Sequence, residues 1–235
     1  MRGRPHPVRH LPPPLSTRPG LVVEAADAAG RTTLWTPGLS DPPSRYGERV
    51  RYREGMALRH WDPTRSKLAA ALLRGVGDLP VKRGARLLYL GASAGMTVSH
   101  LADWIGPEGR VFAVERSPRM FPRLLSLARA YPNVYPLLAD AQDPREYFGE
   151  VPEVGMIYQD VSQPDQGAIA RENARLFLAA GGTYALVLKR ASQYRRESEQ
   201  DPSEALRPLR VERTIGLAPF YREHQLVVAR LDVSA

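Results

Sequence analysis

The 235-residue sequence contains no cysteine and no long apolar run. Without cysteine, the chain can form no disulfide, no cysteine-ligated zinc site, no iron–sulfur centre and no catalytic thiol. No stretch approaches the 18 or so uninterrupted apolar residues of a membrane span, and the N-terminal segment lacks the apolar core of a signal peptide. These absences predict a soluble intracellular protein with no membrane partner.

Lysine is also scarce, because all but three of the 33 basic residues are arginine. The three lysines are Lys67, Lys82 and Lys189. Arginine stays protonated in proteins whereas lysine can release its proton, so each lysine is a candidate for chemistry. The net charge of +8 and the isoelectric point near 10.0 indicate a polyanionic partner, and nucleic acid is the first candidate.

Composition divides the chain into three segments. Residues 1–20 are rich in proline and arginine and have little to bury, so we predict a disordered basic tail that does not pair as a strand. Residues 21–58 alternate short β-prone runs with turn signals and predict a small antiparallel β domain. Residues 59–235 form the third segment, in which Asp62-Pro63 opens a helix.

Apolar strands and helices alternate from residue 85 onward. The expected strands are 86–91, 110–115, 133–140, 154–160 and 183–190, and the expected helices are 96–105, 118–131 and 166–180, the last ended by Gly181-Gly182. Such alternation predicts an α/β fold with a parallel sheet covered on both faces. The final runs, 209–217 and 224–233, predict an antiparallel pair at one edge of the sheet.

The turn GASAG, from Gly91 to Gly95, joins the first of these strands to its helix, where ligands of open α/β sheets bind. One interpretation is a hydrolase nucleophile elbow, with Ser93 as nucleophile and Asp160 and His224 following in the right order. An elbow lies deep in its sheet, however, and no segment here offers a second oxyanion-hole N–H. We therefore favour the second interpretation, a nucleotide site.

Acidic residues end three successive strands beside this turn. Glu115 can accept hydrogen bonds from ribose hydroxyls, Asp140 suits an adenine amino group, and Asp160 lies near the reacting centre. The turn lacks the middle glycine of dinucleotide-binding proteins, which favours S-adenosylmethionine, a cofactor without a pyrophosphate. The pattern predicts a methyltransferase. The alternative is that each acid only caps the helix after it.

Five segments, YGERVRYREG, WDPTRSKLAAAL, YLGASAGMTVSHLADWIGPEGRVFAVE, DVSQPDQ and FYREHQLVV, follow one another between about residues 45 and 230. They resemble the fibrillarin family, in particular its archaeal fibrillarin-like 2′-O-methyltransferases. The resemblance implies the Rossmann-like α/β fold of class I S-adenosylmethionine-dependent methyltransferases. It implies a seven-stranded, mostly parallel sheet whose last strand is antiparallel, next to a small N-terminal β domain.

The resemblance also implies the site residues. A catalytic tetrad falls on Lys67, Asp160, Lys189 and His224, which uses two of the three lysines. Cofactor-binding residues fall on Gly91, Ala92, Met96, Thr97, Glu115, Arg116, Asp140, Ala141, Asp160, Val161, Ser162 and Gln163. The family usually has threonine where this chain has Met96, and an aromatic residue where it has Arg116. No metal is implied.

The implied reaction is methyl transfer from S-adenosylmethionine to a ribose 2′-hydroxyl, the group that distinguishes RNA from DNA. The implied substrate is rRNA, with tRNA as a second candidate. The implied partners are a guide RNA, a Nop-type scaffold protein and a kink-turn-binding ribosomal-type protein. The nucleolar Gly/Arg-rich domain is absent, so we expect a cytoplasmic protein. A stand-alone RNA methyltransferase and a non-catalytic subunit that only binds the cofactor remain alternatives.

Overall fold

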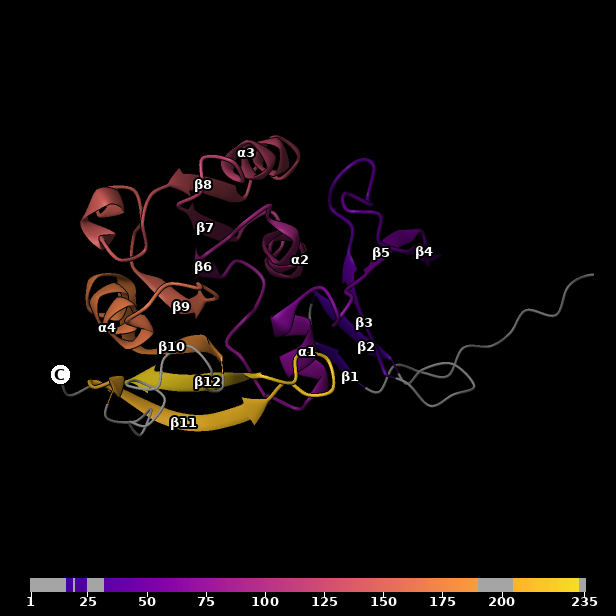
Figure 1. Cartoon of the computed structure of the whole chain (residues 1–235). Helices are drawn as coiled ribbons and strands as arrows, with labels where there is room; N and C mark the ends of the chain where they lie inside the picture. The colour runs from indigo at the N-terminus through magenta and orange to yellow at the C-terminus, as the bar shows by residue number, and fades with distance from the viewer. Residues whose placement is uncertain (1–15, 19, 25–31, 190–204, 233–235) are drawn as a thin grey trace, which may run out of the picture.

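A computed structural model describes residues 16–18, 20–24, 32–189 and 205–232, which contain two β-sheets (Figure 1). The smaller sheet has the strand order β1-β2-β3-β5-β4, and every neighbouring pair is antiparallel. Its strands are β1 Ser16–Arg18, β2 Leu21–Glu24, β3 Thr33–Pro37, β4 Val50–Arg53 and β5 Met56–His60. An antiparallel N-terminal sheet therefore forms as expected.

One strand lies where the proline-rich tail was expected. Residues 16–18 pair with Leu21–Val23 of β2, so the prediction that no strand forms before residue 21 is wrong. The prolines end at Pro14, and Ser16 and Thr17 have the backbone N–H groups that a strand needs. The rest of the expected tail, residues 1–15, lies outside the described residues.

The larger sheet has the order β11-β12-β10-β9-β6-β7-β8. Its strands are β6 Arg86–Leu90, β7 Arg110–Glu115, β8 Val134–Leu138, β9 Val154–Gln159, β10 Leu178–Lys189, β11 Leu209–Gly216 and β12 His224–Leu231. Strands β6 to β10 pair in parallel, and β12 runs antiparallel to both β10 and β11. The structure thus confirms a seven-stranded, mostly parallel sheet whose last strand is antiparallel.

Helices cover both faces of this sheet. They are α1 Lys67–Leu73, α2 Met96–Ile105, α3 Phe121–Ala130, the short 3₁₀ helix η1 Pro144–Tyr147 and α4 Gln166–Phe177. Helices α1, α2 and α3 share one apolar cluster with Leu21 and Leu34 of the small sheet, whereas α4 and η1 pack in a cluster on the opposite face. In Figure 1, α1 and α2 lie between the two sheets. None of the helices among the described residues has the length and apolarity to cross a membrane.

Helix boundaries differ from the sequence prediction at α1, α3 and α4; α3 spans Phe121–Ala130 rather than 118–131. Helix α1 begins at Lys67 rather than after Asp62-Pro63, because the Ser66 hydroxyl caps it by accepting the N–H of Ala69 at 3.3 Å. Helix α4 ends at Phe177, four residues before Gly181, and β10 begins at once with Leu178. The glycine pair belongs instead to a register irregularity in β10, between Leu178 and Thr183.

Candidate active site

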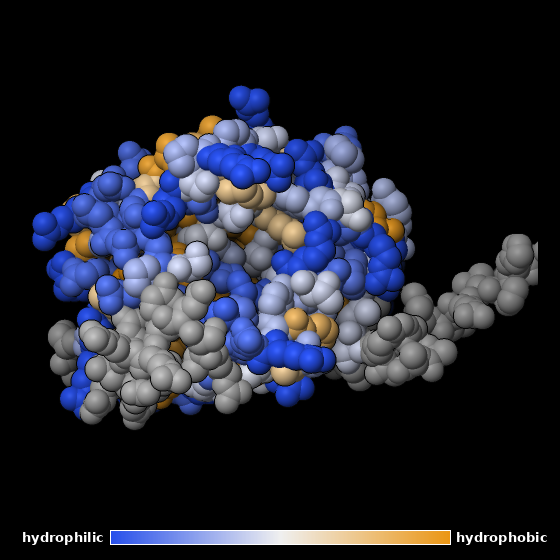
Figure 2. Space-filling view, in the orientation of Figure 1, coloured by the Kyte–Doolittle hydropathy of each residue, from blue (hydrophilic) through white to orange (hydrophobic). Residues whose placement is uncertain are grey.

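A cavity of about 1160 Å³ lies at the carboxyl ends of β6, β9 and β10. Its walls are the β6–α2 turn, the chain after β9, the first half of α4, the end of β10 and the start of α1. Figure 2 shows this face of the molecule as largely hydrophilic, with a hollow near its centre. Parallel sheets gather their ligands at this edge, so the position agrees with a binding site.

The β6–α2 turn has a backbone shape that brings main chain close to the cavity. Gly91, Ser93 and Gly95 have φ angles of 83°, 51° and 88°, in the left-handed region that favours glycine. A Cβ atom on Gly91 would lie 2.5 Å from the carbonyl oxygen of Asp160, so only glycine fits there. The start of α2 follows directly, and free N–H groups at a helix start are suited to a polar ligand.

Lys67 and Asp160 form an ion pair inside the cavity. The Lys67 Nζ lies 2.7 and 3.0 Å from the two carboxylate oxygens of Asp160, and both side chains are about one-fifth exposed. Ser66 fixes Lys67 at the start of α1, and the Asp160 N–H donates to the carbonyl of Leu90 at 2.9 Å. The pair therefore joins α1 to the end of β9.

Lys189 and His224 lie opposite each other on neighbouring strands. They are direct partners in the β10–β12 register, and both line the cavity. The Lys189 Nζ lies 3.5 Å from the carboxylate of Glu223, and its side chain is 40% exposed. All four residues of the implied tetrad thus meet in one cavity. Asp160, however, takes Lys67 as its ion-pair partner rather than Lys189.

The surroundings of His224 favour its neutral form. Burial disfavours the imidazolium, and the nearby charges of Lys67 and Lys189 add to this, so the pKa of His224 falls below its usual 6.5. Tyr221, which the sequence did not single out, packs edge-on against His224 with ring centroids 5.9 Å apart. The Lys67 Nζ lies 5.7 Å from the same Tyr221 ring, and the Tyr221 hydroxyl donates to the carbonyl of Thr64 at 2.9 Å.

The expected cofactor-binding residues form two groups. Those that line the cavity are Gly91, Ala92, Met96, Thr97, Asp160, Val161 and Ser162. The others, which are not among the described residues that line it, lie at or beyond the ends of β7, β8 and β9: Glu115, Arg116, Asp140, Ala141 and Gln163. The two groups are linked through the turn, because Glu115 accepts the N–H of Ser93 at 2.7 Å and the N–H of Ser117 at 2.7 Å.

Asp140 is held by three groups. It accepts the N–H of Gln142 at 2.9 Å and the side-chain amide of Gln163 at 2.6 Å, and Arg116 lies 3.4 Å from its second oxygen. Burial alone would raise the pKa of Asp140, but these hydrogen bonds and the Arg116 charge lower it below its usual value. Arg116 therefore pairs with Asp140 in this structure. The buried carbonyl of the next residue, Ala141, accepts the amide of Asn173 at 2.9 Å.

Tyr46 is a second residue that the sequence analysis did not identify. It comes from the small sheet's β3–β4 connection, yet its hydroxyl donates to the carbonyl of Ala94 in the β6–α2 turn at 2.7 Å. Tyr46 does lie in the segment YGERVRYREG, which contributes to the family resemblance. No local pattern reveals a contact between residues 48 positions apart.

Ser93 is expected not to act as a nucleophile. Its N–H is bound by Glu115, and Asp160, the acid that a hydrolase triad would need, is paired with Lys67. We expect fluorophosphonate probes to leave Ser93 unlabelled. We also expect Ser93→Ala, a change at an exposed side chain, to keep the methyl transfer that the resemblance implies within about two-fold of wild type. Covalent labelling of Ser93, measured by peptide mass spectrometry, would restore the hydrolase interpretation.

Comparison with known proteins points to one family. The family model for fibrillarin matches residues 19–233. A fibrillarin-like rRNA/tRNA 2′-O-methyltransferase from Aeropyrum pernix is 40% identical over 217 residues, which cover 88% of this chain and 91% of the relative. The crystal structure of Aeropyrum pernix fibrillarin with natively bound S-adenosyl-L-methionine superposes with a TM-score of 0.82 at 39% identity, covering 89% of this chain and 94% of that one. A fibrillarin/Nop5p complex superposes with a TM-score of 0.71 at 38% identity, covering 88% of this chain and 96% of that one.

Proposed function

Because this chain belongs to the fibrillarin family, we propose that it transfers a methyl group from S-adenosylmethionine to ribose 2′-hydroxyls of rRNA and tRNA. The observation that carries the proposal is the meeting of Lys67, Asp160, Lys189 and His224 in one cavity with the glycine turn. These residues come from four separate elements, α1, the end of β9, β10 and β12. Such an arrangement supports catalysis at this cavity.

The residues around the turn fit S-adenosylmethionine. Gly91 leaves room where a side chain would strike main chain, and Glu115 and Asp140 can accept hydrogen bonds from ribose and adenine. When bound, this cofactor supplies a methyl group on a positively charged sulfur, and its departure leaves a neutral thioether. The carboxylate of Asp160 lies in the cavity and can offset positive charge there.

The protein must bring the hydroxyl oxygen into line with the methyl group and take the hydroxyl proton. Positioning of this kind contributes on the order of 7–11 kcal/mol in favourable cases. We assign positioning to the Lys67–Asp160 ion pair, which holds both side chains in a defined place. We assign proton acceptance to Lys189, which lines the cavity and whose ion pair with the exposed Glu223 is long, at 3.5 Å. Neutral His224 can donate or accept a hydrogen bond beside it.

RNA fits the charge of the molecule. The net charge is +8, and Arg65, Lys67, Arg171 and Lys189 line the cavity. Such a surface attracts phosphates without selecting a sequence. We propose that a guide RNA selects the target. In that assembly a Nop-type scaffold, as in the relative's complex with Nop5p, and a kink-turn-binding ribosomal-type protein hold the chain in a cytoplasmic particle.

The test is mass spectrometry of rRNA 2′-O-methylation by the purified chain, with and without a guide RNA and the two scaffold proteins. Methylation that needs the complete particle is expected. Methylation by the chain alone would favour the stand-alone enzyme. Binding of S-adenosylmethionine without methylation in either reaction would favour a structural subunit.

Glu115→Ala is expected to weaken S-adenosylmethionine binding by about 1–3 kcal/mol, or roughly 5- to 150-fold in Kd. The change removes a ribose acceptor and leaves the N–H groups of Ser93 and Ser117 without their partner. Titration calorimetry measures the change in Kd. Glu153→Ala, the same substitution at an exposed glutamate, is the control. Equal affinities for wild type and Glu115→Ala would contradict the assigned cofactor site.

A further inference from the structure

We propose that Tyr46 is a positioning residue for the cofactor, through which the N-terminal sheet holds the β6–α2 turn in its binding shape. The inference rests on the proposed function, because it takes this turn as part of the S-adenosylmethionine site. Its central contact is the 2.7 Å hydrogen bond from the Tyr46 hydroxyl to the carbonyl of Ala94. Ala94 lines the cavity together with Gly91, Ala92 and Ser93.

The turn has a backbone that needs support from outside. Ser93 has a φ of 51°, which is unfavourable for a residue with a side chain and persists only where the surroundings enforce it. Glu115 of the large sheet supplies one restraint by accepting the Ser93 N–H. Tyr46 of the N-terminal part supplies a second on the next residue, Ala94. Two consecutive residues are thus held by groups from two different parts of the fold.

Tyr46 is itself held in place. The carboxylate of Glu48 accepts the N–H of Tyr46 at 2.7 Å and the N–H of Arg45 at 3.1 Å, and Arg65 donates to the Tyr46 carbonyl at 3.1 Å. Burial raises the pKa of Tyr46 to about 12, so its hydroxyl keeps the proton that it donates to Ala94. The loop therefore presents a fixed donor.

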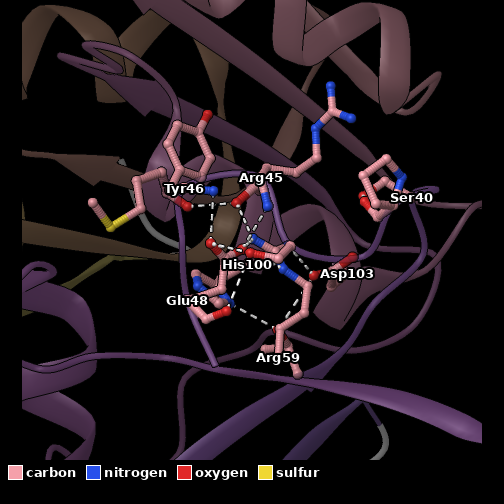
Figure 3. Close-up of polar contacts among 12 residues, drawn as sticks. Ser40, Arg45, Tyr46, Glu48, Arg59, His100 and Asp103 are labelled. Carbon is pink, nitrogen blue, oxygen red and sulfur yellow. Dashed lines mark hydrogen bonds and ion pairs between the residues drawn. The ribbon is translucent and has the colours of Figure 1, made fainter. Parts of the chain in front are cut away.

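A buried arginine ties this loop to the helix that follows the turn (Figure 3). Arg59 of β5 is fully buried; its Nε donates to Glu48 at 2.7 Å, and it also forms an ion pair with Asp103 of α2. The same guanidinium donates to the Ser99 hydroxyl at 3.0 Å, again on α2. A buried guanidinium is stable only when acidic and polar groups pair with it. Arg59 therefore links the loop that carries Glu48 to helix α2. The small sheet thereby fixes both the turn and the helix after it.

The consequence should appear in affinity rather than in chemistry. Without the Tyr46 hydroxyl, the peptide after Ala94 loses the partner that sets its orientation, and the turn must be ordered when the cofactor binds. We expect Tyr46→Phe to raise the Kd for S-adenosylmethionine about five-fold, the equivalent of one hydrogen bond of about 1 kcal/mol. The kcat at saturating cofactor should stay at the wild-type value, because Tyr46 is not among the residues that line the cavity.

The experiment compares the full-length wild type, Tyr46→Phe and Tyr52→Phe by titration calorimetry with S-adenosylmethionine and by amide hydrogen exchange. Tyr52 is the matched control because it lies on β4 and is 72% exposed. The inference expects weaker binding and faster exchange in residues 92–97 for Tyr46→Phe alone. Equal affinity of Tyr46→Phe and wild type overturns it, and so does faster exchange spread evenly over β7 and α3, which would mark general destabilisation. A wild-type chain that binds no S-adenosylmethionine would overturn the proposed function as well.

Discussion

Lys189→Arg is expected to lower the single-turnover rate of methyl transfer by at least about 100-fold, the lower end of what general-base assistance contributes. Arginine keeps the positive charge but stays protonated, so it cannot accept the hydroxyl proton. The planar guanidinium is also larger than the ammonium group that it replaces. The fold should be unchanged, because the Lys189 side chain is 40% exposed and its ion pair within the described part of the chain is with the exposed Glu223. Cofactor affinity, measured separately by calorimetry, should be close to wild type.

Lys82→Arg is the matched control for this substitution. Lys82 is exposed, precedes β6 and does not line the cavity, so its replacement should leave the rate unchanged. The rate of Lys67→Arg should lie between those of Lys189→Arg and Lys82→Arg, because arginine can still pair with Asp160 although it fills more of the site. Wild-type activity of Lys189→Arg would contradict the assignment of the base, and if Lys82→Arg were the inactive variant the lysine argument would fail altogether.

Asp160→Asn is expected to lower kcat by roughly 1000-fold, the upper end of the range for removal of one electrostatic group from a reacting site. The amide keeps the shape of the carboxylate but not its charge. It leaves the Lys67 ammonium without its counter-ion beside the place where a sulfonium would lie, so two cations face each other. Binding of S-adenosylmethionine should weaken as well, because the cavity loses a negative charge.

Single-turnover methylation at saturating cofactor measures this change. Glu108→Gln serves as the control, because it also removes one carboxylate, from an exposed pair with Arg83 at 3.6 Å. The melting temperature is measured as well, because Asp160 is only about one-fifth exposed and its substitution can also lower stability. A lower rate with an unchanged melting temperature shows loss of chemistry without loss of fold. A normal rate for Asp160→Asn would show that the Lys67–Asp160 pair holds the fold together and takes no part in catalysis.

The sequence alone predicted the order of strands and helices from residue 85 onward. The start and end of α2 and β7 agree with the predicted 96–105 and 110–115, because apolar runs and glycine turns are local signals. The same signals placed Glu115, Asp140 and Asp160 at the edge of the sheet where the strands end. Lysine scarcity made Lys67 and Lys189 candidates for chemistry, and resemblance to a family then joined them with His224 in one site, which no local pattern would have done.

Tertiary structure decided the contacts between distant segments. Asp160 binds Lys67 across 93 positions, and Tyr46 binds the Ala94 carbonyl across 48. Arg59, which reads in sequence as one more surface charge, is fully buried between Glu48 and Asp103. Sequence patterns report periodicity and turn chemistry within a few residues. The partner of a charged side chain, in contrast, is set only when the folded sheets bring distant segments together. The elements could therefore be predicted from the sequence, but the partners of their charged groups depended on how those elements pack.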